Sequence, residues 1–235
     1  MRWNEVRGLA VVLLACMAPN VVRAAWPLVS FQPGRGFPLI ADGAPVAIWL
    51  EPSAPTGLLR VAGWFADDLE RLSGHRPRLA VGDQPPAREC LIAGVIGQGG
   101  LVDRLIAEQR IDVASIRQQR EASVICIVER PAPGVDRALV VAGSDKRGAI
   151  YGLFDLSRAA GVSPWHWWAD VPAERRSDAC VSGLPFVRPA PKVRYRGIFI
   201  NDEAPALADW AQEKGSSAEF VGELTLLGGA RGKGP

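Results

Sequence analysis

Short apolar runs of strand length alternate along this chain with longer segments whose apolar residues recur every three or four positions. The strand-length runs are PVAIWL (45–50), RPRLAV (76–81), CLIAGVIG (90–97), ASVICIVE (122–129) and RALVVAG (137–143). Runs of this length, rich in β-branched residues and separated by turn residues, are typical of strands. Because helical segments lie between several of them, the alternation predicts an α/β domain, which we expect over residues 26–188.

Three segments have helical spacing. The first covers residues 53–74, is expected to end at Gly74, and has one apolar face made of Leu58, Ala62, Phe65, Leu69 and Leu72. A second helix is expected to carry Leu101, Leu105 and Ile106 on one side. A third runs through SDKRGAIYGLFDLSRAAG (144–161). Its Gly148 and Gly152 lower helix propensity, so we expect another part of the chain to pack closely against them.

The charge balance argues against one class of partner. The chain has 235 residues, with 27 basic and 25 acidic side chains and a net charge of +2, and no long Lys/Arg block. Nucleic-acid-binding surfaces need clustered positive charge, so we expect no nucleic-acid partner. A hydrophobic content of 48% supports a packed core.

The first 25 residues have the pattern of a signal peptide. Positive charge in MRWNEVR precedes the short apolar run GLAVVLLACMA, and the small residues of VVRAA offer cleavage after Ala24 or Ala25. The apolar run is shorter than the ~20 residues that cross a bilayer, so no transmembrane span is expected. We therefore predict a periplasmic or secreted protein. LLAC also resembles a bacterial lipoprotein cleavage site, which would leave a lipid anchor on Cys16.

Three further cysteines, Cys90, Cys126 and Cys180, have no zinc-binding spacing, and the chain has two histidines. We therefore predict no metal site and no cofactor. Cys90 and Cys126 lie in apolar runs, so we expect them to be small buried hydrophobic residues.

The stretch GVIGQGG (94–100) lies between a strand and a helix, where dinucleotide-binding loops occur. The full pattern needs glycine at its first, third and sixth positions. Counted from Gly97, the third position is Gly99 but the sixth is Val102, and Asp112 follows too closely to bind a ribose. We favour a tight strand-to-helix turn.

The stretch GSDKRG (143–148) also leads from a strand into a helix. Ser144 or Asp145 can cap that helix by accepting hydrogen bonds from its free N–H groups. Alternatively, Lys146 and Arg147 could hold an anion such as a sugar carboxylate at the helix N-terminus. We favour capping with a surface ion pair, and keep Lys146 and Arg147 as secondary candidates for substrate binding.

The stretch SPWHWWADVP (163–172) holds three tryptophans within four positions. Tryptophan N–H groups need hydrogen-bond partners when buried, so burying all three is difficult. The cluster could clamp two parts of the protein together, or one ring could stack on a sugar. Trp165 and His166 are therefore further secondary candidates for substrate binding.

Two long strings, ALVVAGSDKRGAIYGLFDLSRAAGVSPWHWWADVP (138–172) and VRYRGIFINDEAPAL (193–207), resemble glycoside hydrolase family 115, the xylan α-1,2-glucuronidases. The resemblance implies an exported enzyme that removes glucuronic or 4-O-methylglucuronic acid from glucuronoxylan or aldouronic oligosaccharides. It also implies an N-terminal α/β domain similar to the helper domain of β-hexosaminidases, followed by a (β/α)8 barrel. A homo-oligomer is compatible with the resemblance for the full-length enzyme.

The resemblance places residues 189–235 at the start of the barrel. YRGIFI resembles the first barrel strand, and Asn201, Asp202 and Glu203 follow it, at the end where barrel enzymes have their active sites. We expect these three side chains to contact substrate, with Asp202 the best single candidate. The alternative is that they cap a helix whose start Pro205 marks.

We do not expect the catalytic acid and base within this chain. Glycoside hydrolysis needs two carboxylates on opposite sides of the scissile bond, whereas Asp202 and Glu203 are adjacent. The tail AEFVGELTLLGGARGKGP (218–235) also departs from the family pattern. We therefore expect a truncated or frame-shifted α-glucuronidase fragment that is inactive by itself. The alternative hypothesis is a non-catalytic carbohydrate-binding or interaction domain that uses Trp165, Trp167 and Trp168.

Overall fold

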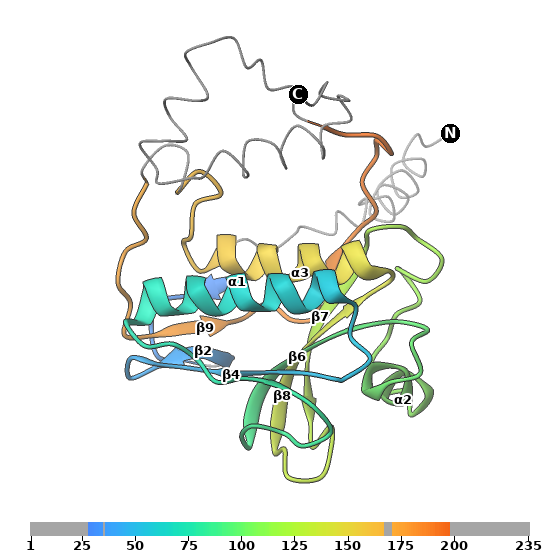
Figure 1. Ribbon diagram of the computed structural model, residues 1–235, viewed down its shortest axis with the longest axis horizontal. Helices are drawn as coiled ribbons and strands as arrows, with labels where there is room; N and C mark the ends of the chain where they lie inside the picture. The colour runs from blue at the N-terminus through green and yellow to red at the C-terminus, as the bar shows by residue number, and fades with distance from the viewer. Residues whose placement is uncertain (1–27, 35, 167–170, 198–235) are drawn as a thin grey trace, which may run out of the picture. The chain divides into compact units, whose positions relative to one another are not determined.

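The computed structural model describes residues 28–34, 36–166 and 171–197 of the chain. The chain divides into two compact units, residues 1–191 and 192–235, and the helices and strands described below lie in the first (Figure 1). The predicted signal segment with Cys16, the tryptophans Trp167 and Trp168, and the predicted substrate contacts Asn201, Asp202 and Glu203 all lie outside the described residues.

A six-stranded sheet forms the centre of the first unit and confirms the α/β prediction. Its strand order is β10-β7-β8-β6-β4-β5. The pairs among β4, β5, β6 and β8 are parallel, whereas β7 pairs antiparallel with both β8 and β10. The strands are β4 (Ala47–Leu50), β5 (Leu79–Val81), β6 (Glu89–Val95), β7 (Ser123–Glu129), β8 (Arg137–Gly143) and β10 (Phe186–Arg188).

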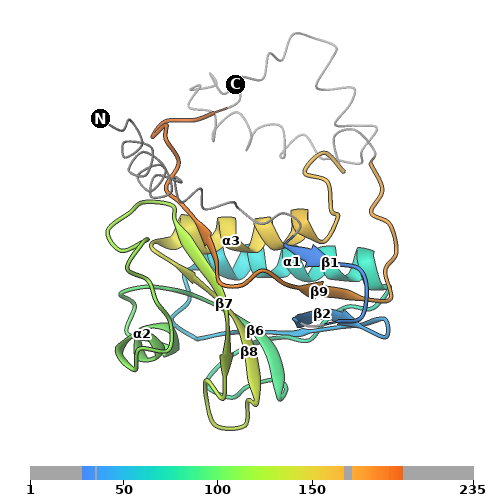
Figure 2. The same cartoon turned by 180° about the vertical axis from the view of Figure 1, so that it is seen from behind.

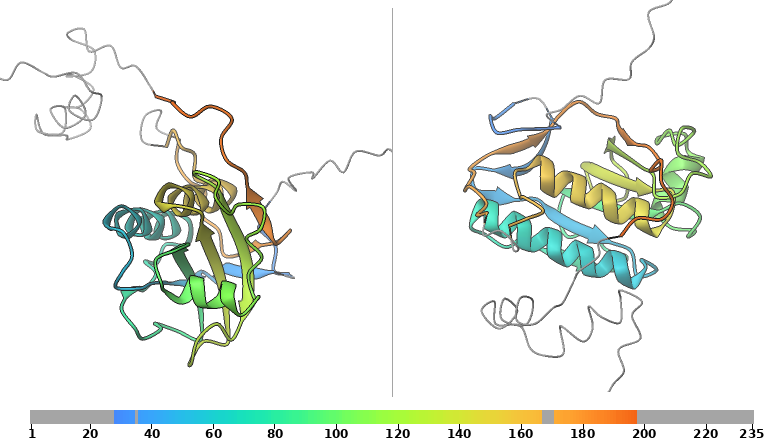
Figure 3. Two further views of the ribbon diagram at one scale, coloured as in Figure 1. Left: turned by 90° about the vertical axis from the view of Figure 1, so that its right-hand side faces the viewer. Right: turned by 90° about the horizontal axis from the view of Figure 1, so that it is seen from above.

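The three helices form where their periodicity predicts them, and they cover both faces of this sheet. Helices α1 (Thr56–Ser73) and α3 (Lys146–Ala159) lie side by side over one face, and α2 (Leu101–Ala107) lies on the other (Figures 1 and 3). Successive strand residues point to opposite faces, so Leu91 joins the core under α1 and α3 while Ile92 joins the core under α2. As predicted, α1 ends at Gly74, which has the left-handed φ of 88° that glycine adopts without strain.

A second, four-stranded sheet was not expected from the sequence. Its order is β1-β9-β2-β3, and β1, β9 and β2 are seen beside one another in Figure 2. Its inner residues pack on the same core as α1. The strands are β1 (Val29–Ser30), β2 (Phe37–Ala41), β3 (Ala44–Pro45) and β9 (Ala179–Val181). The single strand predicted over residues 45–50 is wrong in this respect, because Pro45 belongs to β3 and Ala47–Leu50 to β4 in the other sheet.

Helix α3 packs so closely against its neighbours that two of its glycines leave no room for a side chain. A Cβ atom at Gly148 would lie 2.0 Å from the carbonyl oxygen of Ala122, and one at Gly152 would lie 2.5 Å from Val141 Cγ1. This contact confirms the close approach predicted from the two glycines. It also fixes the helix whose outer face carries the site described next.

Candidate functional site

The described candidates from the sequence do not meet in one site. Lys146 and Arg147 begin α3, whereas Trp165 and His166 follow its C-terminal end. A helix rises 1.5 Å per residue, so the 14 residues of α3 separate the two pairs by about 20 Å.

The N-terminus of α3 is capped by the chain itself, as predicted. The Asp145 carboxylate accepts hydrogen bonds from the backbone N–H groups of Gly148 (2.7 Å) and Glu121 (2.8 Å). Arg147 Nη1 lies 3.2 Å from the carboxylate of Glu121, which is itself buried. The side chain of Asp145 therefore takes the place that an anion would occupy at this helix end.

The glycine turn before α2 is closed in the same way. Asp103 accepts from the N–H groups of Gly97 (2.8 Å) and Gly99 (2.6 Å), and Glu51 accepts from that of Leu101 (2.6 Å). These are the backbone donors that a dinucleotide phosphate would need. The tight-turn interpretation is confirmed.

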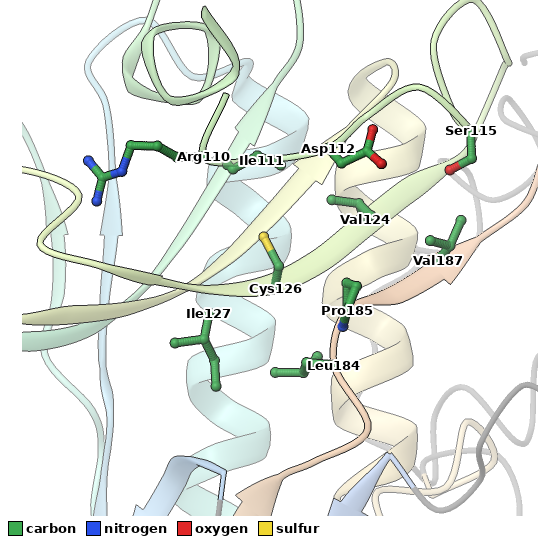
Figure 4. A pocket seen from close by; sticks show the side chains of 10 residues that line it. All are labelled: Arg110, Ile111, Asp112, Ser115, Val124, Cys126, Ile127, Leu184, Pro185 and Val187. Atoms are coloured by element: carbon green, nitrogen blue, oxygen red, sulfur yellow. The ribbon is translucent and has the colours of Figure 1, made fainter. Parts of the chain in front are cut away.

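A cleft between β7, β10 and residues 110–115 has a cysteine in its wall, but its thiol is not a reactive group (Figure 4). Its volume is about 340 Å³, and Cys126 lies among Ile111, Leu184, Pro185 and Val187 in its wall. Burial raises the pKa of the Cys126 thiol to about 11, so it stays protonated and unreactive at neutral pH.

The other two cysteines of the described residues lie away from solvent. Cys90 and Cys180 are buried, and burial raises the pKa of Cys90 to about 12. The prediction of small buried hydrophobic residues is confirmed for Cys90, whereas Cys126 is only partly buried. Among the described residues, no group of three or more His, Cys, Asp or Glu side chains could hold a metal ion.

A cleft whose lining is mainly apolar, with several charged groups, runs over the outer face of α3, and we call it the α3 cleft. Its volume is about 430 Å³. Helix α1 contributes Asp68, the turn after α3 contributes His166, and β10 contributes Arg188. From α3 itself come Tyr151, Phe154, Asp155, Ser157 and Arg158.

An ion pair closes one side of the α3 cleft. Arg188 Nη1 donates to both carboxylate oxygens of Asp155, at 2.5 and 2.6 Å, and its guanidinium lies 5.1 Å from the centre of the Tyr151 ring. The Asp155 side chain is 12% exposed and the Arg188 side chain 34%, so the carboxylate is largely buried while the guanidinium keeps some contact with solvent. Arg188 is therefore held as a wall of the cleft, with its charge neutralised.

A second buried carboxyl lies on the other side. Burial raises the pKa of Asp68, and the neighbouring Ser157, Arg71 and His166 partly offset that rise. Arg71 donates to the Asp68 carboxylate at 2.8 Å. The Ser157 hydroxyl lies near this carboxyl, but it makes no geometrically well-formed hydrogen bond among the described residues.

The turn after α3 presents the two aromatic candidates from the sequence. His166 Nδ1 lies 3.1 Å from the carbonyl oxygen of Ser163, which assigns the proton of a neutral ring to Nδ1. His166 lines the α3 cleft, and the adjacent Trp165 is 58% exposed. A large exposed aromatic ring beside an apolar cleft that carries a few polar groups is a feature of ligand-binding surfaces.

Two comparisons with known proteins decide the family. The family model described as glycosyl hydrolase family 115 matches residues 188–225, beginning at Arg188 in β10. A solved structure of BtGH115A matches with a TM-score of 0.59 and 34% identity over 75% of this chain and 21% of that chain. It is described as a family 115 4-O-methyl-α-glucuronidase with specificity for decorated arabinogalactans. The chain belongs to glycosyl hydrolase family 115.

The chain spans about a fifth of the length of that family 115 enzyme. Another solved structure, CpGH84D, matches with a TM-score of 0.37 and 12% identity over 57% of this chain and 20% of that chain, which is too distant to carry an argument. A search of curated proteins gave no match. Within the described part of this family 115 chain, no helix is long and apolar enough to cross a membrane.

Sequence reasoning missed Asp68, Asp155, Ser157 and Arg188 of the α3 cleft. Asp68 carried a signal, because it falls between Phe65 and Leu69 on the apolar stripe of α1, where a charged residue is costly. The Asp155–Arg188 pair had no such signal, because its partners lie in different elements.

Proposed function

We propose that this chain is part of an exported α-glucuronidase that removes glucuronic or 4-O-methylglucuronic acid side groups from glucuronoxylan. The observation that carries the proposal is the family 115 match over residues 188–225, which includes Asn201, Asp202 and Glu203. In this proposal residues 26–188 are a helper domain like that of β-hexosaminidases, and residues 189–235 begin a (β/α)8 barrel. We propose that the side chains of these three residues contact the substrate.

The proposed enzyme does not use the carboxylates of the α3 cleft as its acid and base. Retaining and inverting glycosidases need a protonated acid and a free carboxylate facing each other across the scissile bond. Asp155 is bound by Arg188 and Asp68 by Arg71. We propose that the 235-residue chain alone is inactive, and that parts of a family 115 enzyme not found in this chain supply the catalytic pair.

The substrate has two possible backbones. The resemblance in the sequence favours glucuronoxylan, whereas the solved family 115 relative is specific for decorated arabinogalactans. Both polymers present an acidic sugar on a neutral backbone. We propose glucuronoxylan or aldouronic oligosaccharides as the partner, with decorated arabinogalactan as the comparison substrate.

A chimeric enzyme tests this proposal. Residues 28–225 of this chain would replace the matching segment of the solved 4-O-methyl-α-glucuronidase, and release of 4-O-methylglucuronic acid would be measured on both substrates. We expect activity, and we expect Asp202→Asn in the chimera to lower it by roughly ten- to a hundredfold, the worth of one charged hydrogen bond. A folded chimera that releases no uronic acid, or one whose activity does not change with Asp202→Asn, would contradict the proposal.

One observation favours a second candidate function. Trp165 is 58% exposed beside the α3 cleft, as expected if the tryptophan cluster is a platform for sugars in a carbohydrate-binding domain. Binding of oligosaccharides by this chain, combined with an inactive chimera, would favour this alternative.

A further inference from the structure

We propose that the α3 cleft is an accessory site that binds a neutral sugar, namely one or two pyranose units of the backbone to which the uronic acid is attached. The inference rests on the proposed function for the identity of the polymer. It separates backbone binding, by the α/β domain, from recognition of the uronic acid, which belongs to the catalytic part.

The outer wall of the cleft can stack on a sugar ring. Phe154 is 40% exposed, and Tyr151 lies one helical turn before it on α3. The C–H face of a pyranose is apolar and packs on such rings, while its hydroxyl groups point to the side. A volume of about 430 Å³ falls in the range of ligand pockets, roughly 300–1,000 Å³, and accommodates one or two sugar units.

The inner wall offers a buried hydroxyl that lacks a good partner. Ser157 is 5% exposed, lines the cleft, and forms no well-formed hydrogen bond among the described residues. A buried hydroxyl left in this state costs free energy that a ligand hydroxyl would restore. The Asp68 carboxyl beside it adds an acceptor, and His166 Nε2 adds another when its ring is neutral.

The charges of the cleft favour a neutral ligand over a uronate. Arg188 is neutralised by Asp155, and Arg71 behind the cleft by Asp68. The third cation, Arg158, is also engaged in an interaction. A ligand carboxylate would therefore lie near two poorly solvated carboxyls, those of Asp155 and Asp68, whose side chains are 12% and 10% exposed. The cations of the cleft are already engaged with other groups. The cleft thus matches the backbone sugar and not the acidic side group.

Ligand titrations of the 235-residue chain test the inference. Xylotriose, galactobiose and glucuronic acid would be compared by saturation-transfer NMR and calorimetry. We expect millimolar binding of at least one neutral oligosaccharide, and glucuronic acid to bind roughly tenfold more weakly or not at all. A preference between xylotriose and galactobiose identifies which backbone the site takes.

Two cleft variants and one control locate the binding. Phe154→Ala and Ser157→Ala should each weaken it by roughly tenfold, because one removes the stacking ring and the other a hydrogen bond. Ser157→Ala should leave the melting temperature unchanged or higher, since no well-formed hydrogen bond is lost. Trp64→Ala removes another exposed ring, 50% exposed and on α1 outside the cleft lining, and should not change the affinity.

Three results would overturn the inference: no binding of either neutral oligosaccharide, affinity unchanged in both cleft variants, or tighter binding of glucuronic acid. These outcomes are independent of the chimera. An active chimera with no oligosaccharide binding by this chain overturns the accessory site alone. Binding that the cleft variants weaken, with an inactive chimera, overturns the hydrolase proposal alone.

Discussion

At two strand-to-helix turns of the six-stranded sheet, carboxylate side chains accept hydrogen bonds from backbone N–H groups. Asp145 accepts from the N–H of Gly148 at the start of α3 and from that of Glu121 just before β7, and Asp103 and Glu51 accept from N–H groups at the turn before α2. Such turns often bind phosphates or other anions in α/β proteins. Here the sites are filled internally, which explains why the glycine-rich turn has a structural role.

The cap at Asp145 gives a direct stability prediction. Asp145→Ala removes the acceptor for Gly148 N–H and Glu121 N–H together, so we expect a loss of about 2 kcal/mol in the free energy of unfolding. Urea denaturation followed by circular dichroism measures it. Asp136→Ala is the control, because its ion pair with Arg88 is well exposed and should change stability by about 0.5 kcal/mol or less. Equal losses in the two variants would contradict this account of the cap.

Burial of Asp68 predicts a pH dependence with a definite sign. Because burial raises the pKa of this carboxyl, the folded state binds its proton more tightly than the unfolded state does. This group therefore makes the protein less stable as pH rises through its folded pKa. Melting temperatures from about pH 4 to 7 should show the wild type losing stability relative to Asp68→Asn as pH rises. A relative gain would mean that the Arg71 ion pair outweighs desolvation.

Helix α3 is held to the sheet by two glycines, and a matched pair of variants tests this packing. A Cβ at Gly148 would lie 2.0 Å from Ala122 O, whereas a Cβ at Gly63 in α1 meets no atom within 4 Å. Gly148→Ala should therefore destabilise the fold by about 2 kcal/mol or more through overpacking. Gly63→Ala should stabilise it by about 0.5–1 kcal/mol, because alanine has the higher helix propensity. Chemical denaturation measures the free energy of unfolding of both variants. No loss for Gly148→Ala would contradict the packing account.

Most elements that the sequence pattern predicted bury a continuous apolar face, although the short edge strand β5 is largely exposed. The face from Leu58 to Leu72 identifies α1, and the apolar runs identify β4 to β8. The small sheet escaped prediction because its strands have two to five residues, too few to establish a period. Its pairing also joins β2 near the start of the described chain to β9 near its end, as in Phe37 with Val181, which no local pattern reveals.

The same limit applies to the α3 cleft. Trp165 and His166 could be selected because their local composition is unusual, and the capping residue Asp145 of the GSDKRG stretch follows from short-range rules. Arg188 and Asp155 meet only after β10 pairs with β7 beside α3. Sites built from separate elements depend on tertiary packing, which residue spacing does not encode.

At the scale of the whole molecule, export is a prediction that can be checked on the mature protein. We expect cleavage after Ala24 or Ala25, so N-terminal sequencing of protein expressed in a bacterial host should begin at Ala25 or Trp26. Incorporation of labelled palmitate that Cys16→Ala abolishes would instead establish the lipoprotein alternative. Protein retained in the cytoplasm with Met1 intact would contradict both.

The central proposal is that this family 115 chain supplies a scaffold and part of a substrate-binding surface, and that it does not hydrolyse the substrate by itself. The measurement that tests it most directly is uronic acid release by the purified 235-residue chain from aldouronic oligosaccharides, glucuronoxylan and decorated arabinogalactan, with the solved relative acting on decorated arabinogalactan as positive control. The account predicts no release above buffer. Release that Asp202→Asn or Glu203→Gln abolishes would contradict it, because this chain would then assemble a working active site by itself.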